Sequence, residues 1–190
     1  MQGVIVDLEE IARHLNRAGT SAAPCSWLPA ISVFVDEYYE NYDYDVIGPR
    51  DRLRIARVLK ELGYRQLNGR QFDGPEGRVE FPKPTRLLAS DPAAELEKVL
   101  RQTGAVALAT PTQVVLTTWR REGPGLGDGR LEALRGLVRE QPANLDKVRD
   151  WLRGTEHEPD FRRHKPQLAA IQEEGYQLRR TGRFRTQLPR

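Results

Sequence analysis

The segment 48–65, GPRDRLRIARVLKELGYR, constrains the fold most strongly, because its apolar residues recur at the spacing of an amphipathic helix. Gly63 is placed where such a helix ends. The segment follows directly on residues 30–47, AISVFVDEYYENYDYDVI, which are rich in β-branched and aromatic residues typical of strands. A strand-like run leading into an amphipathic helix predicts a fold that mixes both elements. The predicted buried stripe of the helix consists of Leu53, Ala56, Leu59 and Leu62, widened by Ile55 and Val58.

Residues 30–47 fit two descriptions that periodicity does not separate. They form either one long strand or a short helix followed by a strand. The strand prediction is firmest from Tyr42 to Ile47.

The rest of the chain alternates between the same two patterns. We predict helices over residues 7–18, 91–104, 111–122, 130–140 and 144–154, a hairpin over 69–84 whose turn is 73–77, and a buried strand over 105–109. Thr110 and Gln113 have the spacing of a capping box, with Pro111 at the first helical position. Asn144 is expected to cap the last of these helices and Gly154 to end it.

These elements predict an α/β or α+β fold, in which a small mixed sheet is flanked by helices and a helical C-terminal part follows. The glycine-rich segment 122–129, EGPGLGDG, suggests a division between an α/β domain over 1–121 and a helical region over 122–190. The second region ends in a basic tail.

Composition excludes several classes of protein. The 30 basic and 27 acidic residues give a formal charge of only +3, so net charge alone does not indicate a nucleic-acid-binding protein. A single cysteine, Cys25, excludes an internal disulfide and suits a reducing compartment. Residues 1–15 lack the features of a signal peptide, and no run approaches the about 20 apolar residues of a membrane span. We therefore expect a cytoplasmic protein with no membrane partner.

Asp43 and Asp45 are the candidate metal ligands. In a strand they project from the same face, and two close carboxylates repel each other unless a cation lies between them. Mg²⁺ binds such hard oxygen ligands. Glu80 is the candidate third carboxylate, because Val79 and Phe81 would point into the core while Glu80 faces the other way. The alternative is that the pair forms the solvated lip of an ordinary loop.

The order of these features resembles the nucleotidyltransferase fold of the polymerase-β-like superfamily. More narrowly, it is similar to bacterial nucleotidyltransferase-like proteins of abortive-infection and toxin–antitoxin systems. The similarity covers residues 32–154. The matching pieces are DYDVI, LKELGYR, RVEFPKP, ATPTQVVLTTWRR and ANLDKVRDWLRG.

This resemblance implies transfer of a nucleoside monophosphate from an NTP to a hydroxyl of RNA or protein. Asp43, Asp45 and Glu80 would be both the Mg²⁺ ligands and the catalytic residues. The family places a Gly-Gly or Gly-Ser pair before the first aspartate, whereas here the window holds Ser32, the candidate nucleotide-binding residue, and no glycine. The alternative is a catalytically inactive module of the same fold that binds nucleic acid or a protein partner.

Outside this set, the arginines of the tail are the strongest electrostatic signal. Cations without nearby acids bind phosphates, although terminal charge runs are also commonly solvated. Thr110 and Thr112 are interpreted as caps, and Trp119 more often packs beneath a helix than stacks on a base. His157 and His164 lie in a segment that looks loop-like and show no zinc-ligand spacing. The candidate nucleic-acid-binding residues are Arg179, Arg180, Arg183 and Arg185.

Overall fold

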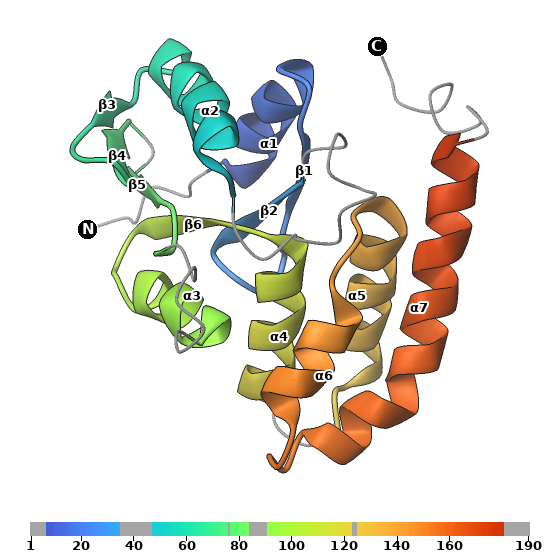
Figure 1. Ribbon diagram of the computed structural model, residues 1–190. Coiled ribbons are helices and arrows are strands. Elements are labelled where there is room, and N and C mark those ends of the chain that lie inside the picture. The colour runs from blue at the N-terminus through green and yellow to red at the C-terminus, as the bar shows by residue number, and fades with distance from the viewer. Residues whose placement is uncertain (1–6, 35–46, 76, 84–90, 123–124, 181–190) are drawn as a thin grey trace.

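The computed structural model describes residues 7–34, 47–75, 77–83, 91–122 and 125–180. Their strands form one six-stranded sheet in the order β1-β2-β6-β5-β4-β3, in which β2, β6 and β5 run parallel and the other neighbours antiparallel (Figure 1). The predicted mixed sheet flanked by helices is therefore confirmed. The strands are β1 (Ser21–Pro24), β2 (Ala30–Phe34), β3 (Arg65–Gln66), β4 (Gln71–Gly74), β5 (Gly77–Glu80) and β6 (Ala105–Ala109).

Helices cover both faces of this sheet. Two of them pack on one face and the remaining described helices lie on the other side (Figure 1). The first group is α1 (Leu8–Arg17) and α2 (Pro49–Glu61). The second group is α3 (Pro92–Leu100), α4 (Pro111–Glu122), α5 (Asp128–Glu140), α6 (Leu145–Leu152) and α7 (Glu158–Arg180).

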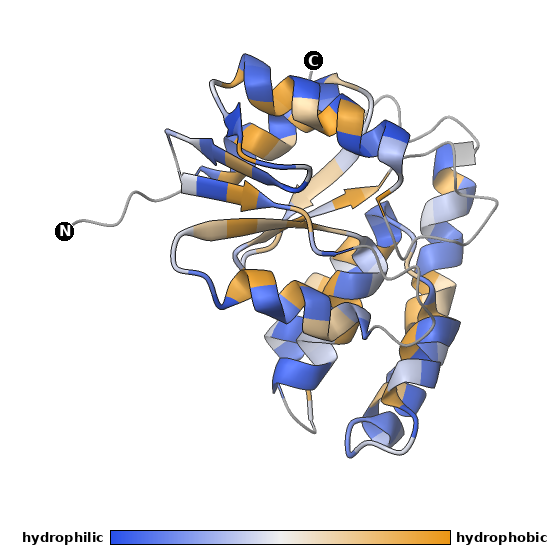
Figure 2. Ribbon diagram, turned by 60° about the vertical axis from the view of Figure 1, so that its left-hand side comes forward, coloured by the Kyte–Doolittle hydropathy of each residue, from blue (hydrophilic) through white to orange (hydrophobic). Residues whose placement is uncertain are grey.

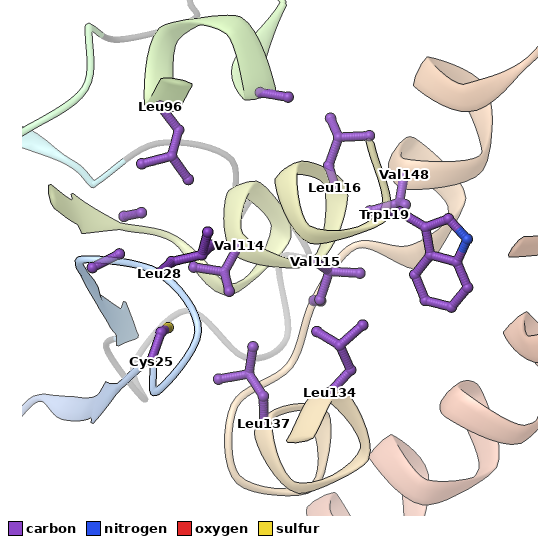
Figure 3. Close-up of a cluster of buried hydrophobic side chains, with 14 of the residues drawn as sticks. Cys25, Leu28, Leu96, Val114, Val115, Leu116, Trp119, Leu134, Leu137 and Val148 are labelled. Carbon is purple, nitrogen blue, oxygen red and sulfur yellow. The ribbon is translucent and has the colours of Figure 1, made fainter. Parts of the chain in front are cut away.

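The two hydrophobic clusters follow from the alternation of side chains along the strands. Ala30 and Ala107 belong to the first cluster, which includes residues of α3 to α7. Their neighbours Ile31 and Leu108 belong to the second cluster, which includes residues of α1 and α2. The central strands are coloured as hydrophobic between the two helix layers in Figure 2. Figure 3 shows the first cluster, in which α4 contributes Val114, Val115, Leu116 and Trp119.

Local signals in the sequence placed most of the helix ends correctly. The Asp7 carboxylate accepts from the backbone N–H of Glu10 at 3.0 Å and caps α1. Asn144 caps α6 in the same way, accepting from the backbone N–H of Lys147 at 3.0 Å. Gly63 ends α2 with a φ of 86°, in the left-handed region that glycine adopts at low cost.

The predicted stripe of α2 is wrong at one residue. Leu53 is 71% exposed, whereas Ile55, Ala56, Val58 and Leu59 are buried as predicted. Positions 55 and 59 lie one turn apart on the face that meets the sheet, and position 53 points about 160° away from 55, as two residues advance about 200° around a helix. Ile47, the one described residue of the predicted strand 42–47, lies outside any strand.

The helix α7 is a second departure from the sequence prediction. It contains His164 and continues through Gly175 to Arg180, so the start of the basic tail is helical. Pro166 lies inside it and masks the helical pattern, because proline usually interrupts a helix.

The helices beyond residue 122 share a core with the preceding part of the chain. One cluster combines Ala30 and Ala107 of the sheet with Leu134 of α5 and Phe161 of α7. The predicted boundary thus falls between α4 and α5 within one continuous hydrophobic cluster. None of the helices in the described ranges is long and apolar enough to cross a membrane.

Candidate functional site

The carboxyl ends of β2, β6 and β5 meet at one edge of the sheet, because these strands are parallel neighbours. After β2 the chain returns as α2 on one face, whereas β6 leads directly into α4 on the other (Figure 1). Strands whose connections leave to opposite faces create a topological switch point, where α/β proteins commonly bind ligands. Asp43 and Asp45 belong to the connection that follows β2, and they lie outside the described residues.

Glu80 is the last residue of β5 and lies on the same sheet face as Ser32. It is in register with Ala107 of β6, which is in register with Ala30 of β2, and Ser32 lies two residues farther along β2. Val79 and Phe81 occupy the cluster on the opposite face, as the sequence pattern predicts for neighbours of Glu80. With one strand between them, β5 and β2 are separated by about 10 Å.

The Glu80 carboxylate is buried, with 3% of the residue exposed, and both its oxygens have partners within the β4–β5 hairpin. Arg70 Nη1 lies 3.4 Å from Oε1, and Gln71 Nε2 donates to Oε2 at 2.8 Å. A buried carboxylate requires such compensation. A metal ion at Glu80 would therefore share the carboxylate with these two partners.

Ser32 is completely buried and is bonded to the C-terminal helices. Its hydroxyl donates to Gln141 Oε1 at 2.5 Å, and Gln141 Nε2 donates to the backbone oxygens of Ser21 at 2.9 Å and Ser32 at 3.3 Å. Gln141 thus ties β1 and β2 to the end of α5. Nothing in the sequence pattern points to Gln141, because it lies 109 positions from Ser32 and outside any periodic stripe.

The start of α4 adds more buried polar side chains at the same edge. The backbone N–H of Thr110 donates to Gln113 Oε1 at 3.0 Å, and the Gln113 N–H donates to Thr110 Oγ1 at 3.2 Å, so the predicted capping box is confirmed. Thr112 Oγ1 accepts from the backbone N–H of Asn144 at 2.9 Å. These hydroxyls therefore hold α4 and α6 in place.

The predicted nucleic-acid residues are only partly within the described chain. Arg179 lies in α7, and its guanidinium donates to the backbone oxygen of Glu140 at the end of α5. Arg180 is the last residue of α7, whereas Arg183 and Arg185 lie outside the described residues.

Trp119 is buried, and its ring meets that of Phe161 edge to face at a centroid distance of 5.0 Å. This packing confirms the interpretation of Trp119 as a core residue. The neighbouring Arg120 bonds to Asp91 and, at 3.0 Å, to the backbone oxygen of Trp151, so it links α3 to α6.

Cys25 lies in the first cluster with Leu28 and Leu137 (Figure 3). Burial raises the pKa of its thiol to about 12, against the opposing effect of a backbone hydrogen bond from Ser32. The thiolate is the reactive form, so the folded chain suppresses thiol chemistry at this position.

We predict that iodoacetamide at pH 8 leaves Cys25 unmodified in the folded protein, because the raised pKa lowers the thiolate fraction about a thousandfold and burial blocks access. The chain unfolded in guanidinium chloride should be modified fully under the same conditions. Intact-mass spectrometry over time measures both reactions, and equal rates would contradict the buried position of Cys25.

Within the described residues, no three His, Cys, Asp or Glu side chains are grouped so that they could hold a metal ion. Asp43 and Asp45 lie outside these residues. Comparisons with protein-family models, curated proteins and solved structures found no match to the chain.

Proposed function

We propose that the chain is a nucleotidyltransferase-like protein that binds an NTP with Mg²⁺ beside the carboxyl end of β2 and transfers the NMP to a hydroxyl of RNA or protein. One observation carries the proposal. Glu80 lies at the carboxyl end of β5, one strand away from β2, and Asp43 and Asp45 belong to the connection that follows β2. The connections that follow β2 and β6 lead to helices on opposite faces of the sheet, and this arrangement favours a ligand site at the carboxyl ends of these strands.

In this proposal Asp43 and Asp45 would hold Mg²⁺, which would supply positive charge opposite the triphosphate. Their hard oxygens suit that ion. Glu80 would accept the proton of the attacking hydroxyl once Arg70, 3.4 Å away, turns from the carboxylate toward the phosphates. The hydroxyl oxygen would bond to the α-phosphorus while the bond from the α-phosphorus to the bridging oxygen of the β-phosphate breaks, so that pyrophosphate leaves. The chain then acts mainly by positioning and by compensating charge.

A second candidate is a module of the same fold that has lost the chemistry and binds nucleic acid or a protein partner. The engagement of Glu80 by Arg70 and Gln71 favours it, as does the bond between Ser32 and Gln141. The sequence also has no glycine between Gly19 and Gly48 that would let a backbone approach a triphosphate closely.

We predict that the chain binds at least one of ATP, CTP, GTP and UTP in the presence of Mg²⁺. The double substitution Asp43→Asn and Asp45→Asn should weaken this binding at least about 100-fold, because two metal-ligating charges are lost. Isothermal titration calorimetry with and without EDTA provides the measurement. The control is Asp73→Asn, which removes an exposed carboxylate of β4 and should leave the affinity unchanged. Failure of the wild-type chain to bind any NTP would leave only the second candidate.

A further inference from the structure

The outward face of α2 carries a row of cations. Arg50, Arg54, Arg57 and Lys60 fall within about 120° of one another around the helix, with 3.6 residues per turn. Arg50, Arg57 and Lys60 are exposed, and Leu53 in the middle of the row is 71% exposed. The opposite side of the helix is buried in the second cluster, so this face points away from the sheet (Figure 1).

Three cations of this row, Arg50, Arg57 and Lys60, differ from several cations of other helices in the described residues, which pair with acids. On other helices, Arg101 pairs with Glu97 at 3.1 Å, Arg149 with Asp146 at 3.0 Å and Arg162 with Glu158 at 3.2 Å. The acids of α2 are Asp51, which is buried, and Glu61, its last residue. In the part of the chain that the structure describes, neither Arg50, Arg57 nor Lys60 has an acidic partner.

The end of α1 lies beside this row. Arg54 Nη1 donates to the backbone oxygen of Gly19 at 3.4 Å, which places the end of α1 beside α2. Arg17, the last residue of α1, is exposed there. By contrast, Arg52 is turned toward the molecule, with its guanidinium carbon 5.3 Å from the centroid of the Phe81 ring.

The spacing of the charges fits a polyphosphate backbone. Arg50 and Lys60 are separated by about 15 Å along the axis at 1.5 Å per residue. One strand of a nucleic-acid duplex presents about four phosphates over that length. The helix N-terminus, where the row starts, adds positive potential.

A protein partner fits this face less well. Stable protein interfaces bury about 800 Å² on each side around an apolar centre. Here Leu53 is the one large exposed apolar residue of the helix face, and it is surrounded by cations. A linear charge row with a single apolar residue is better matched to phosphates and sugars than to a folded surface.

We propose that the outward face of α2 binds the phosphate backbone of a nucleic-acid duplex. This surface lies on α2, whereas Arg179 lies on α7, which packs on the opposite face of the sheet. It does not depend on Asp43 or Asp45, so it can function whether or not the chain transfers nucleotides.

The test is fluorescence anisotropy of a labelled 20-base-pair duplex, as DNA and as RNA in separate arms, with the full chain between about 50 and 200 mM salt. The triple variant R50Q/R57Q/K60Q should bind at least about tenfold more weakly than wild type, and its log–log salt slope should be shallower by about 3. The control is R101Q/R153Q/R162Q, which removes three exposed arginines and the same charge from other helices. It should change the affinity less than about threefold.

Circular dichroism of each variant checks that it remains folded. Equal losses in the two triple variants would overturn the proposal, because binding would then follow net charge alone. It would also be overturned if the wild-type chain bound neither duplex, or if it bound a poly-glutamate peptide of matched charge more tightly than either.

Discussion

Replacing Gly175 by alanine is expected to lower the free energy of unfolding by about 2–3 kcal/mol, although alanine normally stabilises a helix interior. Gly175 is buried in α7 against the last turn of α5. A Cβ at this position would clash with the backbone oxygen of Arg139 and lie 2.8 Å from its carbonyl carbon. Backbone atoms inside a helix cannot move aside as a flexible side chain can, so α7 would have to shift away from α5.

The matched control is Gly136→Ala, in the exposed middle of α5, where an added Cβ meets nothing within 4 Å. This substitution should raise the free energy of unfolding by about 0.5–1 kcal/mol, because it removes only the conformational cost of glycine. Urea denaturation of both variants measures the two effects. If both substitutions stabilised the chain, the close contact of α7 with α5 would be wrong.

The elements that the sequence predicted well are those whose ends are determined by their own residues. Asp7, Thr110 and Asn144 cap helices by accepting from backbone N–H groups three positions farther along the chain, and Gly63 ends α2 by its own conformation. Such signals are contained in a short window, so no knowledge of the tertiary structure is needed to interpret them.

The elements that the sequence did not predict depend on distant partners. α7 has a proline within it, and its backbone approaches α5 closely at a glycine, which no hydrophobic pattern identifies. Leu53 matches the apolar spacing of α2 but lies on its outer face, because tertiary packing selects which of two possible stripes is buried.

The candidate site likewise combines features that are set by neighbouring residues with features that depend on distant ones. The direction of Glu80 followed from the alternation of side chains in a strand, and its contact with Gln71 follows from the hairpin register, which pairs Gln71 with Glu80. The bond between Ser32 and Gln141 spans 109 positions and joins β2 of the sheet to the end of α5. No local pattern in a single sequence predicts such a contact.

Replacing Gln141 by leucine is expected to lower the free energy of unfolding by about 2–4 kcal/mol. Leucine nearly preserves the volume of the side chain. It removes, however, the acceptor of the Ser32 hydroxyl at 2.5 Å and the donor to the Ser21 carbonyl at 2.9 Å, and both serine groups lie where water has little access. The control Gln167→Leu removes one exposed bond to Arg135 and should change stability by less than about 0.5 kcal/mol.

Ser32→Ala, alone and combined with Gln141→Leu, completes a double-mutant cycle that separates the two roles considered for Ser32. If the Ser32 hydroxyl stabilises the fold through its bond to Gln141, the effects of the two substitutions on the free energy of unfolding should be coupled by about 1–2 kcal/mol in urea denaturation. In that case Ser32→Ala should leave NTP affinity unchanged. If instead Ser32 contacts the nucleotide, Ser32→Ala should weaken NTP binding in calorimetry, with additive effects on stability. Additivity without any change in affinity would contradict both roles, because the bond would then contribute nothing to the fold.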